Sequence, residues 1–388
     1  MTGAPQTTTR IYLDHAASSW PKPPEVVEAM HFAMTTLGGN PGRGVYDLAM
    51  HSARAVFDAR NDCARLLGIG ASENLIFVPS CTFGCNLMLL GLLGPGDRVV
   101  VGSMEHNAIA RPLNALAESG VEVVVVPADD TGFVDPDNVE AAVRVAPTRA
   151  VICQHANNIT GTIQAIADLA DIAHENGALL LVDGAQGAGH LRLDLGMLGA
   201  DAYATSGHKG LLGPQGIGLL YLSPKIDPRP LIEGGSGSGD SQSPRMPVDR
   251  PDRYEAGTIN TPGIVGLGAA ARWHLEHGAT QHARESRLIR MLHDGLAELD
   301  GLTVLGPPAQ VERVPVLAFS HDRVDADVLS FELDKRFGIA TRAGLHCSPW
   351  SHETVGTLQH GAVRMGVGFG NTDAQIIEAV EAVASVTA

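Results

Sequence analysis

Two short apolar runs of this sequence each lead to an ionisable side chain that could take part in catalysis. ALLLV (178–182) leads to Asp183, and DAYAT (201–205) leads through Ser206 to Lys209. A lysine in a Gly-flanked turn can lose its proton and form an imine with an aldehyde, and a carboxylate at a rigid strand end can hold a cationic ring nitrogen. Taken singly, Asp183 could equally cap a helix, and Lys209 could be a solvated surface lysine.

Two further turns add an anion site and a flat ring. PSCTFGCN (79–86) opens a helix-like run, so its amide groups and the hydroxyls of Ser80 and Thr82 could bind an anion, with an ordinary helix cap as the alternative. His106, after RVVV (98–101), could stack on a planar cofactor, although a lone histidine is more often structural. The four features together indicate pyridoxal 5'-phosphate (PLP), whose protonated ring is an electron sink for a carbanion.

The elements that must position these residues are short strands alternating with helix-like segments. Continuous apolar runs separated by amphipathic segments indicate strands buried on both faces of a largely parallel sheet. Ligands of such sheets bind beyond the carboxyl ends of the strands, where the candidate residues lie. The predicted strands cover 75–78, 98–101, 121–126, 149–153, 178–182, 201–205 and 217–222.

A second region follows a Gly- and Ser-rich stretch at 233–244, whose composition favours a flexible loop. A long helix is predicted over 264–299. Further strands are predicted at 302–305, 315–319 and 339–342, with helices near 325–336 and from about 372. We therefore expect an α/β fold with a large PLP-binding domain at 23–260, containing a mostly parallel seven-stranded sheet, and a small α+β domain formed by 1–22 and 261–388.

Composition limits the range of partners. The 388 residues and 44% apolar content fit about two globular domains. With 27 basic and 43 acidic side chains, the net charge of −16 argues against nucleic-acid binding and fits a small zwitterionic partner better. No stretch approaches the roughly 20 apolar residues of a membrane span, and residues 1–10 lack a secretory core. We expect a cytoplasmic protein.

The five cysteines are odd in number and widely scattered, which predicts free thiols rather than a disulfide framework. Four lie among apolar neighbours, as core cysteines do. Cys347, in RAGLHCSPW (342–350), has polar surroundings that favour a catalytic thiolate, which Arg342 and the nearby histidines could stabilise. The histidines at 346, 352 and 360 lack a regular ligand spacing, so no metal site is predicted.

Motifs along nearly the whole chain resemble those of the cysteine desulfurases, in the class V branch of the fold-type I PLP enzymes. They are IYLDHAASSWPKP (11–23), NPGRG (40–44), EHNA (105–108), NNITGT (157–162), VDGAQ (182–186), TSGHKGLLGPQGIG (205–218), YEAGTINTPG (254–263), RAGLHC (342–347) and VRMGVGFGNT (363–372).

The resemblance implies a role for each cofactor-binding residue. Lys209 would be the Schiff-base lysine, Asp183 would pair with the pyridine nitrogen, and His106 would stack on the ring. The remaining contacts implied are Asn158 and Gln186 at the ring hydroxyl, and Thr82, Ser206 and His208 at the phosphate, in a loop that includes Ser80 and Cys81. Thr258 would reach the phosphate of the neighbouring subunit, which implies a homodimer.

The resemblance also implies a reaction. Cys347 would attack the sulfur of bound L-cysteine, leaving a persulfide on the protein and releasing alanine. Arg364 would grip the substrate carboxylate, with Arg342 and Asn158 as further substrate contacts. The short connection from Arg342 to Cys347 resembles the group with a short cysteine loop, which usually passes its persulfide to a dedicated acceptor protein.

Two departures from the family pattern leave other functions open. The phosphate loop at 79–83 lacks the usual glycine and acidic position, and Trp350 is bulkier than expected. The alternatives are a selenocysteine lyase, a cystine lyase, or an epimerase or aminotransferase of class V, and those without persulfide chemistry would not need Cys347. A weakly active docking partner in sulfur transfer is a further hypothesis, against which the intact Lys209, Asp183 and Cys347 argue.

Overall fold

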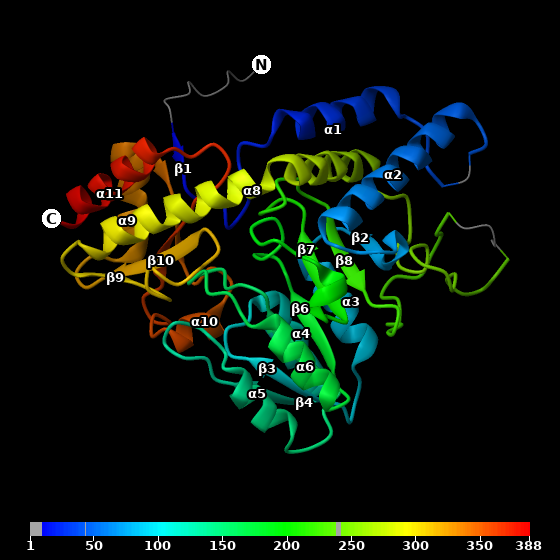
Figure 1. Ribbon diagram of the computed structural model, residues 1–388, viewed down its shortest axis with the longest axis horizontal. Helices are drawn as coiled ribbons and strands as arrows, with labels where there is room; N and C mark the ends of the chain where they lie inside the picture. The colour runs from blue at the N-terminus through cyan, green and yellow to red at the C-terminus, as the bar shows by residue number, and fades with distance from the viewer. Residues whose placement is uncertain (1–9, 43, 238–241) are drawn as a thin grey trace.

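The computed structural model describes residues 10–42, 44–237 and 242–388 and is built around a seven-stranded sheet of order β2-β8-β7-β6-β5-β3-β4 (Figure 1). Strand β8 runs antiparallel to β2 and β7, and the other pairs are parallel. The predicted α/β fold is confirmed, and each of the seven strands predicted for this sheet is present within one residue of its expected bounds. The strands are β2 (Leu75–Val78), β3 (Arg98–Gly102), β4 (Glu122–Val126), β5 (Ala150–Gln154), β6 (Leu179–Asp183), β7 (Ala202–Ser206) and β8 (Gly218–Leu222).

Helices cover both faces of this sheet, which explains the nearly uninterrupted apolar strands. One face packs against α3 and α4, and the other against α2, α5, α6 and part of α8. Among these strands only β4, at one edge of the sheet, has exposed positions. The helices of this region are α1 (Pro24–Thr36), α2 (Asp47–Leu66), α3 (Cys81–Leu92), α4 (Asn107–Glu118), α5 (Pro136–Val143), α6 (Ile166–Glu175) and α7 (Leu195–Leu198), with a 3-10 turn η1 (Ser72–Asn74).

The C-terminal region forms a four-stranded antiparallel sheet of order β12-β13-β10-β9. The strand predicted at 339–342 is divided in two, because Ile339 pairs with Ile11 whereas Arg342 pairs with Arg364. The elements are β9 (Leu302–Val304), β10 (Val316–His321), β11 (Ile339–Ala340), β12 (Arg342–Gly344) and β13 (Ala362–Gly366), with α9 (Ala326–Phe337), α10 (Pro349–Thr354) and α11 (Asp373–Thr387).

Two connections join this sheet to the rest of the protein. Helix α8 (Thr261–Ala297) runs across the molecule from α1 and α2 to α11 (Figure 1). It begins three residues before the predicted start because the Asn260 side chain accepts a hydrogen bond from the amide of Gly263. Strand β1 (Ile11–Tyr12) pairs with β11, so the N-terminal segment lies against the C-terminal region. The domain boundaries at 22 and 260 remain predictions.

The predicted Gly- and Ser-rich loop lies partly outside the described residues, at 238–241, and its described parts form no helix or strand. Within the described ranges, no helix is both long enough and apolar enough to cross a membrane.

Several histidines are buried in a neutral form, and this should make the fold sensitive to acid. Burial lowers the pKa of His15, His155, His274 and His352 to about 4, and that of His346 to about 3. An unfolded histidine titrates near 6.5. Between these values the unfolded chain binds more protons than the folded protein, so stability must fall as the pH drops through this window.

We therefore expect the free energy of unfolding to be highest above about pH 6.5 and to decrease steadily towards pH 4. For one histidine, a shift to about 4 is worth roughly 3 kcal/mol. Urea unfolding at half-unit pH steps measures this slope. In the protein, His155 Nδ1 lies 2.9 Å from the Tyr203 hydroxyl. The variant His155→Gln keeps a polar partner for this hydroxyl but has no group that titrates, so its stability should show a shallower slope with pH. A free energy that is flat or rises towards acid pH would contradict the prediction.

Candidate active site

Five of the residues predicted from sequence line one cavity at the carboxyl edge of the large sheet. The residues that line it are His106, Gln154, Ala156, Asn158, Asp183, Ala185, Gln186 and Lys209. Asp183 is the last residue of β6, and Lys209 follows β7 by three residues. Because β3, β5, β6 and β7 are parallel, the segments that follow them converge here.

The Lys209 turn is held by residues that the sequence analysis did not single out. The Ser19 hydroxyl donates to the carbonyl oxygens of His208 and Lys209, at 3.0 Å each, and Lys22 Nζ donates to the His208 carbonyl at 2.9 Å. Burial lowers the pKa of Lys209, although the Asp183 carboxylate opposes the shift. The environment therefore favours the neutral amine that imine formation needs. The sequence feature that could have identified Ser19 and Lys22 is their position in the motif at 11–23.

Asp183 presents one carboxylate oxygen to the protein and leaves the other for a ligand. Its Oδ1 accepts the amide N–H of Ala185 at 2.9 Å and the thiol of Cys81 at 3.3 Å. Among the described residues, Oδ2 has no hydrogen-bond donor. A carboxylate with one oxygen saturated in this way can offer the other to a protonated ring nitrogen.

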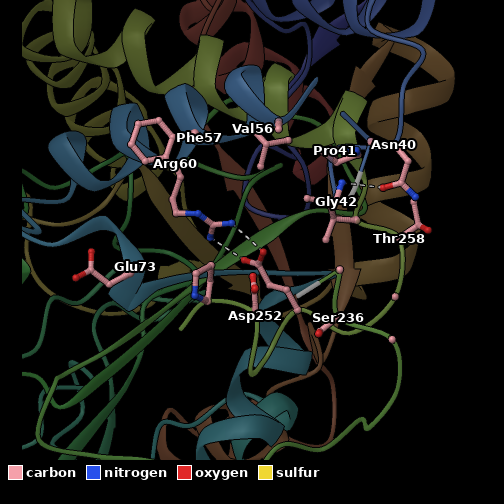
Figure 2. Close-up of a pocket in the computed structure, with 18 of the residues that line it drawn as sticks. Asn40, Pro41, Gly42, Val56, Phe57, Arg60, Glu73, Ser236, Asp252 and Thr258 are labelled. Carbon is pink, nitrogen blue, oxygen red and sulfur yellow. Dashed lines mark hydrogen bonds and ion pairs between the residues drawn. The ribbon is translucent and has the colours of Figure 1, made fainter. Parts of the chain in front are cut away.

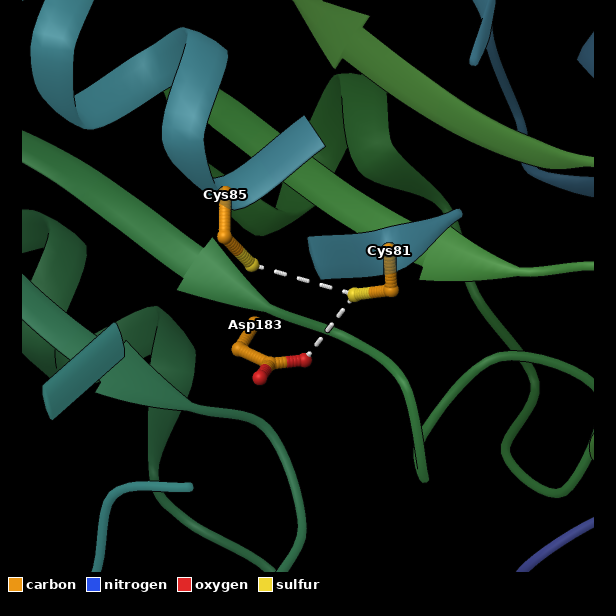
Figure 3. A group of neighbouring side chains, drawn as sticks. All are labelled: Cys81, Cys85 and Asp183. Carbon is orange, nitrogen blue, oxygen red and sulfur yellow. Dashed lines mark hydrogen bonds between the residues drawn. The ribbon is translucent and has the colours of Figure 1, made fainter. Parts of the chain in front are cut away.

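Cys81 and Cys85 lie together beside Asp183, with their sulfur atoms 3.8 Å apart (Figure 3). The bond with Cys81 and burial raise the pKa of Cys85. For Cys81, the bond from Cys85 opposes the shift, but burial and the Asp183 charge prevail and its pKa is also raised. The sequence analysis missed this group, which is close enough to hold a metal ion. Its signal was the spacing of two cysteines one helical turn apart.

The predicted phosphate contacts come from two adjacent segments. Ser206, at the end of β7, pairs with Gly218, and a Cβ on Gly218 would lie 3.2 Å from the carbonyl carbon of Ser80. The Ser80 hydroxyl caps α3 by accepting the amide of Phe83 at 3.2 Å, and Thr82 is exposed in the first turn. Cys81 points towards Asp183 instead, so its role in phosphate binding stays a prediction.

His106 is fixed in one protonation form. Its Nδ1 accepts the amide N–H of Ala108 at 3.0 Å as the cap of α4. Burial, followed by the charge on Lys209, lowers its pKa to about 4, so the neutral ring carries its proton on Nε2. The preceding Glu105 is fully buried and accepts the amide of Gln154 at 2.8 Å, which ties this segment to β5.

Arg364 on β13 is buried and held from two sides. Its Nη2 donates to Asp14 Oδ1 at 3.0 Å and its Nη1 to the carbonyl of Asn158 at 3.2 Å. Its Nε is buried without a partner in the described part of the chain. Asp14, which the sequence analysis did not identify, therefore orients the arginine that we predicted to bind a carboxylate.

Cys347 lies in a strained turn that is tied to the cavity residues. His346 and Cys347 have φ values of 51° and 57°, a left-handed conformation that costs an L residue roughly 1–2 kcal/mol. Asn158 Nδ2 donates to the His346 carbonyl at 3.0 Å, and the Cys347 carbonyl accepts the amide of Asn107 at 2.9 Å. The Asn158 side chain also accepts the Ser348 hydroxyl at 2.7 Å, so it is committed to this turn.

The charges around Cys347 differ from those we expected. The pKa of His346 is lowered to about 3 by burial and then by Arg364, and that of His352 is lowered to about 4 by burial, so neither of these two rings supplies a positive charge at neutral pH. Arg364 is close enough to interact electrostatically with the thiolate. Trp350 packs against the apolar cluster under α3 and α4, which accounts for its size.

Two predicted residues lie apart from the cavity. The Arg342 side chain is exposed on β12, although its carbonyl oxygen contacts the His346 ring at 3.2 Å. Thr258 is exposed and lines a different cavity.

The fold and the site define an α/β enzyme of the fold-type I PLP class. The family model for class-V aminotransferases matches residues 11–379. The chain is 36% identical over 383 residues to a probable cysteine desulfurase of Methanothermobacter thermautotrophicus, covering 96% of this chain and 93% of that one. It is 34% identical over 360 residues to a cysteine desulfurase of Haloferax volcanii, covering 90% and 83%.

Solved structures of cysteine desulfurases also resemble this chain. A cysteine desulfurase from Thermococcus onnurineus, in its apo form, superposes with a TM-score of 0.91 at 30% identity, covering 97% of this chain and 94% of that one. One from Escherichia coli superposes with a TM-score of 0.86 at 28% identity, covering 98% and 96%. The chain belongs to the class-V aminotransferase family, in its cysteine desulfurase branch.

The contrast in cysteine burial gives a direct test of the site. Cys347 is exposed, whereas Cys63, Cys81, Cys85 and Cys153 are buried. We expect native protein to take up one equivalent of iodoacetamide, on Cys347, because a buried thiol is inaccessible and resists ionisation. Peptide mass spectrometry locates the label. The variant Cys347→Ser should take up none, and unfolded protein should take up five equivalents. Labelling of the native variant would show that another cysteine is accessible.

Proposed function

We propose that the protein is a PLP-dependent cysteine desulfurase, which converts L-cysteine to L-alanine and carries the sulfur as a persulfide on Cys347. One observation carries the proposal. All five cysteines lie within the described residues, and the one that is exposed lies in a strained turn that is bonded to Asn158 and to the start of α4, beside the cavity of Lys209 and Asp183. A structural cysteine would need neither the exposure nor these bonds.

The residues around the cavity fit PLP, which when bound supplies an electron sink for the substrate α-carbon. Lys209 would hold it through an imine and Asp183 Oδ2 would accept its ring N–H. His208 Nδ1 and Gln186 Oε1 are buried without partners in the described residues. An unpaired buried polar atom costs about 1–3 kcal/mol. A phosphate at His208 and a ring hydroxyl at Gln186 would satisfy both atoms.

The substrate groups also match the site. The unpaired Nε of Arg364 can donate to the α-carboxylate of cysteine. The Arg342 side chain is exposed apart from the cavity and the Asn158 amide is bonded to the cysteine turn, so their substrate contacts stay predictions. The Cys347 thiolate attacks the sulfur of the substrate. The new S–S bond replaces the substrate carbon–sulfur bond, so L-cysteine and the thiol become L-alanine and a persulfide. Because Cys347 is exposed, a protein acceptor can remove this sulfur. We also propose that the reaction takes place in the cytoplasm.

An assay with purified protein tests this reaction. With L-cysteine and a reductant, we expect alanine and sulfide in equal amounts, and at least about a 100-fold lower rate for Cys347→Ser and Cys347→Ala, because neither can accept sulfur. His360→Ala, on the exposed surface of the same segment, should be unaffected.

Other results would redirect the assignment. An undiminished rate in both Cys347 variants would refute the role of Cys347. No turnover of cysteine would direct the assay to selenocysteine, cystine and amino acids without sulfur. Protein that is colourless and cannot be reconstituted with PLP would support a docking role.

We further propose a homodimer in which Thr258 acts on the neighbouring site. Thr258 lines a cavity of about 870 Å³ between α2 and residues of the segments 40–42, 44–46, 235–237 and 251–259. Figure 2 shows Thr258 beside Asn40 and Gly42 on one side of this cavity, with Phe57 on the other. The surrounding surface is apolar and exposed, which is typical of a subunit interface. Its exposed apolar residues include Val45, Tyr46, Leu48, Met50 and Phe57.

The loop that carries Thr258 is firmly anchored. Arg60 and Glu255 form a buried double hydrogen bond, at 2.7 and 2.8 Å, and Glu255 also accepts the amide of Phe77 at 2.7 Å. This anchor fixes an exposed threonine on an apolar face without directing it to the cavity of its own chain.

Mixed dimers separate action within a subunit from action between subunits. Lys209→Ala should abolish activity, and Thr258→Glu should reduce it about tenfold or more, because a carboxylate would repel the phosphate. If Thr258 acts across the interface, a dimer of one Lys209→Ala and one Thr258→Glu chain contains one intact site. Co-expressed with different tags and purified as the mixed dimer, it should show about half of wild-type activity. Failure to recover activity would contradict action between subunits.

A further inference from the structure

His352, which no step of the proposed reaction uses, is buried directly behind the cysteine turn. It lies on the short helix α10 with an exposed fraction of 0%. Its Nδ1 is 2.7 Å from the Thr357 hydroxyl, and its Nε2 is 3.2 Å from Nδ1 of His346. The two rings are nearly parallel, at 18°. The far nitrogen of His346 is 3.2 Å from the carbonyl oxygen of Arg342.

The carbonyl oxygen at the end of this series of hydrogen bonds determines which atom carries each proton in it. A carbonyl oxygen only accepts, so His346 Nε2 carries the proton that it donates to Arg342. Both rings are neutral, because burial lowers the pKa of His346 to about 3 and that of His352 to about 4. His346 Nδ1 is therefore an acceptor, and His352 donates to it from Nε2. The Thr357 hydroxyl must then donate to His352 Nδ1.

This series of hydrogen bonds acts on His346, the residue next to Cys347. The backbone of His346 is left-handed, as is that of Cys347, and neither is a glycine. Such a conformation persists only where the surroundings hold it. The His346 carbonyl is held by Asn158 and the Cys347 carbonyl by Asn107, whereas the His346 ring is held by His352 on one side and Arg342 on the other.

We propose that His352 is a positioning residue for Cys347: by orienting the His346 ring, it holds the left-handed turn that aims the thiol at the cavity. The inference rests on the proposed role of Cys347 as nucleophile. His352 itself contacts neither substrate nor cofactor, so its removal should slow the sulfur transfer without weakening substrate binding.

Three variants isolate the hydrogen bonds from the packing. His352→Leu fills the space but makes no polar contact. His352→Gln can donate to His346 and accept from Thr357 through one amide group, so it serves as the conservative rescue. His360→Leu is the matched control, because His360 is exposed on the same segment. Thermal unfolding of each variant, loaded with PLP, verifies that it is folded.

Steady-state kinetics with L-cysteine provide the first readout. We expect kcat of His352→Leu to fall about 10- to 100-fold, the range for a misaligned reacting group, with KM changed less than about threefold. His352→Gln should recover kcat to within about threefold of wild type. A kcat in His352→Leu equal to wild type would overturn the proposal, and so would a folded His352→Gln as slow as His352→Leu.

Amide hydrogen exchange of the segment 345–352 provides a readout that needs no activity. Loss of this series of hydrogen bonds should increase the exchange rate in His352→Leu by at least about tenfold, with no increase in His352→Gln or His360→Leu. Unchanged exchange in His352→Leu would overturn the positioning role even if the enzyme desulfurates cysteine. If wild-type protein does not turn over cysteine but exchange responds as expected, the proposed reaction is refuted. The role of His352 in holding the turn of Cys347 is then still supported.

Discussion

The site depends on one constraint, which is that buried parallel strands end at the same edge of their sheet. Strands β3, β5, β6 and β7 have every position buried or nearly so, and their register cannot slip without exposing apolar side chains. Asp183 and the turn of Lys209 therefore meet at a fixed separation. Helix α3 covers one face of this sheet, and its first turn brings Cys81 against Asp183 near that edge. The lysine and the carboxylate can differ in role because one is desolvated while the other is hydrogen-bonded.

A second set of contacts brings the C-terminal region over this edge. Asp14 lies after β1 and orients Arg364 from β13, and Arg364 donates to the Asn158 carbonyl of the large-sheet side. The Asn158 side chain in turn holds both His346 and Ser348. Residues far apart in the chain thus share one bonded network, so the position of the cysteine turn is coupled to that of the arginine.

Sequence could predict what depends on local pattern. The strands followed from apolar runs, and Asp183 and Lys209 stood out because each follows a strand. Burial, in contrast, is a property of the folded chain, so the neutral state of His346 and His352 could not be foreseen, and charged histidines were expected instead. Cys81 was placed in the predicted phosphate loop, and its thiol's contact with Asp183 could not be foreseen because it depends on the tertiary approach of α3 to β6. The split of the strand at 339–342 likewise reflects pairing with Ile11, which lies at the other end of the chain.

The proposed reaction makes two demands on the Cys347 sulfur, and these account for the strained turn. A thiol that takes sulfur inside a cavity and gives it up to a partner outside must remain exposed, so packing cannot orient it as it orients the four buried cysteines. Hydrogen bonds to the neighbouring backbone can do so without covering the thiol. Two left-handed residues together cost roughly 2–4 kcal/mol, and the bonds from Asn158, Asn107 and the His346 ring are each worth about 1 kcal/mol. The terms are of similar size, so each bond is needed to keep the thiol in place.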